Sequence, residues 1–200
     1  MRWVDVAGPP GVGKSTLMDG LWPPRCIEFD EKPYPKEWAK FIAVTNRLLS
    51  KIQDHPSFAG CKSMTQRSFK KIATISRMKD DRIYIQTGLV QRGLGIGWRL
   101  KDQEEIAAYF EAMPVSLGVV ILFADVETVQ ERNVKRNKDR SHMVPFMERP
   151  TRIAVEVLRD RIPLIELDTR NSVVKNTRKL LAFADRAAQI ADPGAIGYSG

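Results

Sequence analysis

Short apolar runs alternate along this chain with longer segments in which apolar residues recur every three or four positions. The short runs have the length of β-strands, and they cover residues 2–7, 26–30, 82–86, 117–124 and 162–168. The longer segments have the spacing of amphipathic helices, and they cover residues 14–21, 37–52, 62–78, 103–113, 127–138 and 172–191. The run 117–124 is apolar at successive positions, which is typical of a strand covered by helices on both faces. The pattern therefore predicts an α/β fold, a three-layer sandwich with a five-stranded parallel sheet.

The length of 200 residues suits a single domain, which we expect to cover residues 1–191. Residues 192–200 have no periodicity and are expected to form a loose tail. No stretch is long and apolar enough to cross a membrane, and the first residues enter a core strand almost at once, so we expect no signal peptide. Cys26 and Cys61 have neither metal-binding nor redox spacing. These features predict a cytoplasmic protein with reduced thiols.

The first predicted strand leads directly into a glycine-rich segment with the pattern G-x-x-x-x-G-K-S/T. Its members are Gly8, Pro9, Pro10, Gly11, Val12, Gly13, Lys14, Ser15 and Thr16. Strand, loop and helix follow one another as a phosphate-binding loop requires, because the glycines let several backbone N–H groups point at one anion. We expect Lys14 to reach the β- and γ-phosphates of ATP and the Ser15 hydroxyl to hold Mg²⁺.

Ligands of a parallel α/β sheet bind beyond the carboxyl ends of its strands. Asp30 and Glu31 follow the second predicted strand, and we expect one of them to accept the proton of an acceptor hydroxyl. The pattern leaves open which one, because successive strand residues point in opposite directions, and a surface pair at a helix entry is the simpler alternative. Asp168 ends the fifth predicted strand and begins a turn whose backbone is expected to contact adenine; the simpler alternative is that Ser172 or Asn171 caps the last helix, and the two roles are compatible.

The third predicted strand ends in Gln86-Thr87, where phosphate-loop enzymes usually carry an acid that positions Mg²⁺ through water. A glycine-rich turn is expected to follow and to present Gln91 and Arg92 to the cleft. Arg92 is then expected to bind an acceptor phosphate or the transferred phosphoryl group, with a structural salt bridge as the alternative.

Arginines recur on the helix predicted after the fourth strand. Arg132 and Arg136 share one face at a spacing of four, and Arg140 follows within or just beyond the helix, before Pro145 and Pro150 end it. We expect residues 132–150 to form a lid. Arg132 and Arg136 would stabilise charge on the transferred phosphoryl group, and Arg140 would contact the nucleotide. A solvated charged face is the alternative for these arginines.

The chain carries a formal net charge of +8, and much of the excess is local. Between His55 and Lys79 there are six basic residues and no acidic one, namely Lys62, Arg67, Lys70, Lys71, Arg77 and Lys79. Such a segment predicts either a surface that guides a polyanion, with nucleic acid as the obvious one, or a solvated helix face.

With these motifs the chain resembles the nucleoside and nucleotide kinases of the thymidylate kinase and deoxynucleoside kinase group, over most of residues 2–190. The likeness rests on the phosphate loop, the segment Asp30–Pro33 with Trp38, the lid-like arginines and the turn 165–169. Two features depart from the group, since Lys32 separates Glu31 from Pro33 and the acid–arginine pair after the third strand is missing. The small, basic character looks like the phage kinases that phosphorylate 5-hydroxymethyluracil bases in DNA, and this resemblance implies the host cytoplasm.

Together these observations predict an ATP- and Mg²⁺-dependent kinase whose acceptor is a hydroxyl of a 5-hydroxymethyl pyrimidine base in phage DNA. A kinase of a free nucleoside or nucleotide is the first alternative. The second is a DNA-stimulated ATPase or nucleotide switch. An ATPase motor is disfavoured, because 200 residues leave little room for added helical elements and no acid follows the third predicted strand.

Overall fold

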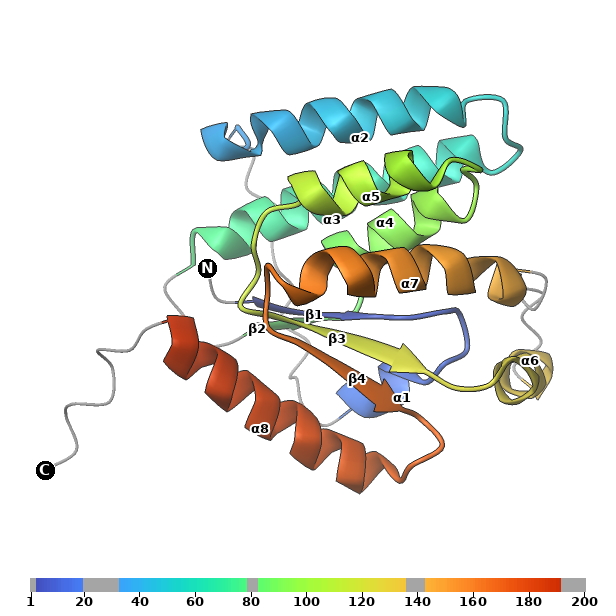
Figure 1. The fold of residues 1–200 in the computed structure, drawn as a ribbon, viewed down its shortest axis with the longest axis vertical. Coiled ribbons are helices and arrows are strands. Elements are labelled where there is room, and N and C mark those ends of the chain that lie inside the picture. The colour runs from blue at the N-terminus through green and yellow to red at the C-terminus, as the bar shows by residue number, and fades with distance from the viewer. Residues whose placement is uncertain (1–2, 20–32, 79–82, 136–142, 192–200) are drawn as a thin grey trace, which may run out of the picture.

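The computed structural model describes residues 3–19, 33–78, 83–135 and 143–191, and its centre is a parallel sheet (Figure 1). The sheet contains the strands β1 (Trp3–Ala7), β2 (Ile83–Ile85), β3 (Gly118–Phe123) and β4 (Leu164–Asp168). Their order is β2-β1-β3-β4, and every neighbouring pair is parallel. The described residues thus form four strands rather than the five predicted. The predicted strand 26–30 lies outside the described residues.

Helices cover both faces of this sheet, as the apolar run of β3 predicts. They are α1 (Lys14–Met18), α2 (Ala39–Lys51) after the short 3-10 helix η1 (Lys36–Trp38), α3 (Phe58–Ser76), α4 (Leu89–Gly97), α5 (Gln103–Ala112), α6 (Val126–Lys135), α7 (Val144–Arg159) and α8 (Val173–Ala191). Figure 1 shows α1 and α8 on one face, and α3, α4, α5 and α7 on the other, with α2 outermost. The three-layer α/β arrangement is therefore as predicted.

The two core layers follow the period of two along each strand. In β3, Val119 and Ile121 pack with the layer of α2 to α5 and α7, whereas Val120 and Leu122 pack with α1 and α8. In β1 the side facing α4 carries a carboxylate, Asp5, whose exposed fraction is 0%. None of the helices within the described ranges has the length and hydropathy needed to cross a membrane.

The glycine-rich turn predicted after β2 is instead a helix, α4, so the prediction was wrong there. A Cβ atom on Gly93 would lie 2.5 Å from the Tyr109 ring, and one on Gly97 would lie 2.8 Å from the side chain of Pro150. These glycines let α4 pack closely against α5 and α7, and that packing outweighs the weak helix propensity of glycine.

Pro145 and Pro150 do not end the helical structure of the predicted lid, because both lie in α7. Pro145 occupies the first turn, where its missing N–H has no helical partner to lose. Pro150 lies inside the helix and is buried beside Gly97. Part of the predicted lid segment 132–150 is thus a core helix, and residues 136–142 lie outside the described residues.

Candidate functional site

The loop between β1 and α1 has the conformation that its glycines predict. Gly11 and Gly13 have φ values of 86° and 104°, in the left-handed region that other residues rarely adopt. A Cβ atom on Gly11 would also lie 2.6 Å from Oδ1 of Asn133. Gly13 directly precedes Lys14, the first residue of α1, so the chain enters the helix through a left-handed residue.

Lys14 folds back over this loop. Its Nζ donates hydrogen bonds to the carbonyl oxygens of Gly8, at 2.7 Å, and Pro9, at 2.9 Å. The ammonium group is therefore held above the loop by main-chain oxygens. A positive charge in this place is suited to the phosphates of a nucleotide.

Three amide side chains from other elements hold the phosphate-binding loop and the first turn of α1. Oε1 of Gln91, in α4, accepts a hydrogen bond from the Gly8 N–H at 3.1 Å, and Nδ2 of Asn133, in α6, donates to the Pro10 carbonyl at 3.0 Å. The Ser15 hydroxyl donates to Oε1 of Gln86, just beyond β2, at 3.2 Å. Sequence reasoning singled out neither Asn133 nor this role of Gln91. For Asn133 the available signal was a polar residue within the predicted helix 127–138, whereas Gln91 lay in a predicted turn.

The buried carboxylate of Asp5 lies at the start of α4. Its Oδ2 accepts a hydrogen bond from the Val90 N–H at 3.0 Å, so it acts as a cap that comes from β1. Its Oδ1 is buried and has no hydrogen-bond partner among the described residues. Burial raises the pKa of Asp5 to about 7, against the lowering effect of the Val90 and Leu89 N–H groups and of Arg92.

Arg92 lies one turn along α4 from this cap, and not on an open turn as predicted. It is half-buried, and desolvation lowers the pKa of its guanidinium against the raising effects of Tyr109, Cys61 and Asp5. Its Nε is buried and has no hydrogen-bond partner within the described parts of the chain. The predicted salt bridge is not formed there. Within the described residues, Arg92 therefore holds a buried Nε without a hydrogen-bond partner, at the start of the helix that follows β2.

Arg132 joins the phosphate-binding loop to the turn after β4. Its guanidinium donates to the Thr169 hydroxyl at 2.9 Å, to the Thr169 carbonyl at 3.1 Å and to the Val12 carbonyl at 3.4 Å. Beside it is a cavity of about 220 Å³, lined by Gly13, Thr16, Leu17, Arg132, Thr169, Asn171, Val173 and Asn176. This cavity continues from the phosphate-binding loop along the side of α1. Arg136 and Arg140 lie outside the described residues.

Asp168 shapes the turn but does not line that cavity. Its carboxylate accepts hydrogen bonds from Arg170, which lower its pKa, and Arg170 also pairs with Asp125 at 3.2 Å. Its carbonyl accepts from the side chains of Asn171 and Asn176. The side chains of Arg170, Asn171 and Asn176 therefore hold the turn through Asp168, and Asp168 contributes by fixing the shape of the turn.

The predicted acids of the site, Asp30 and Glu31, lie outside the described residues. Trp38 is described, and it lies far from the loop. It is fully buried and stacks with Tyr34, while the adjacent Pro33 carbonyl accepts a hydrogen bond from Arg77 at the C-terminal end of α3. Figure 1 shows this end of α3 beside the N-terminal ends of the strands, opposite the phosphate-binding loop. Trp38 is therefore a core residue.

The oxygens of Ser15 and Gln86 are the described groups at the loop that suit a hard cation such as Mg²⁺. The described residues contain no group of three or more His, Cys, Asp or Glu side chains that would hold a metal ion by themselves. The donor set thus fits a cation that keeps several ligands from water or from phosphates.

Three solved structures of one enzyme are similar to this chain over 92% of its length and over their whole length. They are a deoxyadenosine kinase from M. mycoides with the products dCMP and a flexible dCDP (14% identity, TM-score 0.59), with dCTP (12%, 0.53) and with dATP (12%, 0.52). No protein-family model matches the chain, and no curated protein matches it by sequence. The chain therefore shares its α/β fold with this deoxyadenosine kinase.

Proposed function

We propose that this chain is an ATP- and Mg²⁺-dependent kinase that phosphorylates a hydroxyl group of a nucleoside-type acceptor. The observation that carries the proposal is the left-handed glycine loop with Lys14 held above it, in a fold shared with deoxyadenosine kinases. The acceptor oxygen attacks the γ-phosphorus and the bond to the β,γ-bridging oxygen breaks, so that ADP leaves. The acceptor proton passes to a carboxylate, for which Asp30 or Glu31 is proposed.

Different residues are proposed to bind the phosphates, the base of ATP and the acceptor. Lys14 and the N–H groups at the start of α1 would bind the triphosphate, and Ser15 would help to hold Mg²⁺, whose charge would offset part of that of the phosphates. The cavity beside Arg132 and Thr169 would receive the base of ATP. The guanidinium of Arg92 would face the acceptor side, together with Arg136 from the proposed lid, and Arg140 would contact the nucleotide.

For the acceptor we propose a 5-hydroxymethyl pyrimidine base within DNA. The support is the exposed face of α3, where Lys62, Arg67 and Lys70 have no ion-pair partner among the described residues and the helix contains no acid. Ser68 on the same helix donates to the Thr87 carbonyl at 2.9 Å, so α3 adjoins the carboxyl end of β2. Since that contact is made by the buried side of α3, we propose that a polyanion bound on the exposed side extends around the helix to the site.

A kinase of free deoxynucleosides is the second candidate. The similar structures favour it, because they contain dCMP, dCTP and dATP in a deoxyadenosine kinase. The charged face of α3 would then be solvated surface without a part in the reaction.

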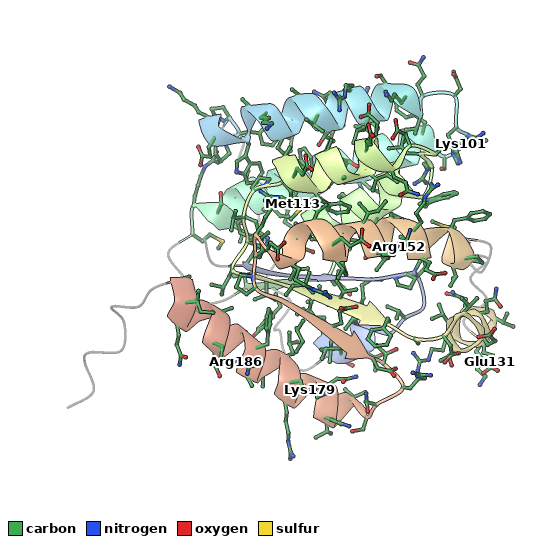
Figure 2. All side chains as sticks on the ribbon, in the orientation of Figure 1. Lys101, Met113, Glu131, Arg152, Lys179 and Arg186 are labelled. Carbon is green, nitrogen blue, oxygen red and sulfur yellow. The ribbon has the colours of Figure 1, made fainter. Side chains whose placement is uncertain are left out.

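The two candidates differ in how they respond to the loss of charge on α3. With a radiolabelled γ-phosphate, we expect transfer to duplex DNA that contains 5-hydroxymethyluracil. The triple substitution Lys62→Gln, Arg67→Gln and Lys70→Gln should raise the KM for DNA by about tenfold or more and flatten its salt dependence. The matched control removes three charges from α8 by Arg178→Gln, Lys179→Gln and Arg186→Gln. Figure 2 shows Lys179 and Arg186 on the opposite side of the molecule.

Transfer to free nucleosides, unchanged by the α3 substitutions, would instead support the second candidate. DNA-stimulated hydrolysis of ATP without a phosphorylated product would contradict both and favour a nucleotide-dependent ATPase.

Arg132→Ala is expected to weaken ATP binding about tenfold or more. The substitution removes the guanidinium that joins Thr169 to Val12 and opens the wall of the base cavity. Isothermal titration with ADP measures the loss directly. The control is Arg159→Ala, because Arg159 forms an exposed ion pair with Glu166 away from this cavity. Equal ADP affinity in both variants would contradict the placement of the base.

A further inference from the structure

Two uncharged side-chain oxygen atoms lie close together beside the phosphate-binding loop. The Ser15 hydroxyl, in the first turn of α1, and the Gln86 amide oxygen, directly after β2, are 3.2 Å apart. Both residues are exposed, in contrast to Ile83 and Ile85 of β2, which are buried. The pair thus faces solvent on the side where a bound triphosphate would lie.

No carboxylate accompanies this pair within the segments that the structure describes next to β2. The residues after β2 are Gln86, Thr87 and Gly88, and Asp5 on the neighbouring strand is directed into α4, where it accepts from Val90. Asp19 lies one turn along α1 from Ser15, further from the loop. Among the described residues, the side-chain oxygen that approaches Ser15 most directly is therefore that of an uncharged amide.

We propose that Gln86 is a cation-positioning residue, and that its neutral oxygen makes Mg²⁺ binding depend on the nucleotide. This inference rests on the proposed kinase function and adds to it how the cation is recruited. Amide and hydroxyl oxygens are suitable ligands for Mg²⁺, but affinity for such cations rises with the number of charged ligands. Ser15 and Gln86 orient the cation, and the phosphates supply the negative charge that retains it.

The nucleotide-free protein provides the first test, with Mn²⁺ as the probe and the electron paramagnetic resonance signal of free Mn²⁺ as the readout. We expect the unmodified protein to bind no Mn²⁺ up to about 1 mM, and Gln86→Glu to bind it about tenfold more tightly or better. Gln86→Met, which keeps the side-chain length without an oxygen, should behave as the unmodified protein does. Tight Mn²⁺ binding by the unmodified protein would overturn the inference, because it would reveal a charged ligand such as Asp30 or Glu31.

The second test measures ADP affinity by calorimetry, with Mg²⁺ and with EDTA. Gln86→Met should lose about tenfold of the gain in ADP affinity that Mg²⁺ provides, while its affinity in EDTA stays unchanged. Asp19→Asn is the matched control and should keep the full gain. If Gln86→Met keeps the gain, or if Asp19→Asn loses it, the inference is wrong.

These measurements separate the inference from the proposed function. A protein that binds ADP in EDTA but shows no effect of Gln86 retains its nucleotide site, and only the role of Gln86 is rejected. A protein that binds no ADP under either condition has no nucleotide site, and then the proposed function fails together with the inference.

Discussion

Lys14→Ala is expected to lower phosphoryl transfer by a factor of about 10³ or more while the protein remains folded. Lys14 is the described cation held directly over the phosphate-binding loop, by the Gly8 and Pro9 carbonyls. Its loss leaves the charge that develops on the β- and γ-phosphates without this counter-charge. Single-turnover transfer of a labelled γ-phosphate measures the effect, and thermal unfolding verifies the fold.

The structural cost of Lys14→Ala should be small, because the lysine is only partly buried and the partners that the structure describes for it are main-chain oxygens of the loop. We expect a change in unfolding free energy of about 1 kcal/mol or less. Lys179→Ala, on the exposed face of α8, controls for the loss of one positive charge. Unchanged transfer by Lys14→Ala would contradict the assignment of the loop as a phosphate site.

The fold was predictable wherever the apolar pattern of a segment matched its final environment. The run 117–124 predicted β3 within two residues, because helices cover that strand on both faces. The phosphate-binding loop at 8–16 was equally predictable, since the residues that define it are nine consecutive ones. Local chemistry also governs the start of α5, where the Asp102 side chain accepts a hydrogen bond from the Glu104 N–H only two residues later.

Helix α4 was not predictable, because its glycines are set by tertiary packing. Gly93 and Gly97 are the typical residues of a turn, yet each occupies a place where a larger side chain would meet α5 or α7. The same holds for Pro150. Proline usually ends a helix, but Pro150 packs beside Gly97 inside α7. Local propensity cannot reveal which neighbour will lie there.

The supports of the phosphate-binding loop were hidden for the same reason. Gln91 and Asn133 reach the loop across 83 and 123 residues of sequence, and nothing in their local pattern indicates these hydrogen bonds. The capping of α4 by Asp5 could not be predicted from the sequence either, since an acid within an apolar strand usually indicates an exposed face. Only the pairing of β1 with β2, which places α4 above Asp5, gives this residue its role.

Asp5→Asn is expected to make the protein more stable than the unmodified form at pH 8 and equally stable near pH 4. The carboxyl has a pKa of about 7 in the folded protein, above its ordinary value of 3.8, because burial disfavours the charged form. The folded state therefore holds a proton that the unfolded state has released between these values. It follows that the stability of the unmodified protein falls as the pH rises from about 4 to 7, and then levels off.

The size of this effect follows from the shift in pKa, and it reaches about 4 kcal/mol at most above pH 7. Asparagine keeps an oxygen to accept from Val90 but carries no charge that must be buried, so the variant should lose this fall in stability. Arg92 and Tyr109 face Asp5 from α4 and α5, and the charge on Arg92 reduces the effect without reversing it. Urea unfolding at pH 5, 6, 7 and 8 measures the difference.

Asp54→Asn serves as the control, because Asp54 is an exposed acid in the connection between α2 and α3. The Asp54→Asn variant should have the same free energy of unfolding as the unmodified protein at every pH, because an exposed carboxylate remains hydrated in both the folded and the unfolded state. If Asp5→Asn keeps the full pH dependence, the carboxylate of Asp5 is charged in the folded protein below pH 5. In that case the attraction of Arg92 and of the α4 N–H groups outweighs the cost of burial, and Asp5→Asn should then be the less stable protein at pH 8.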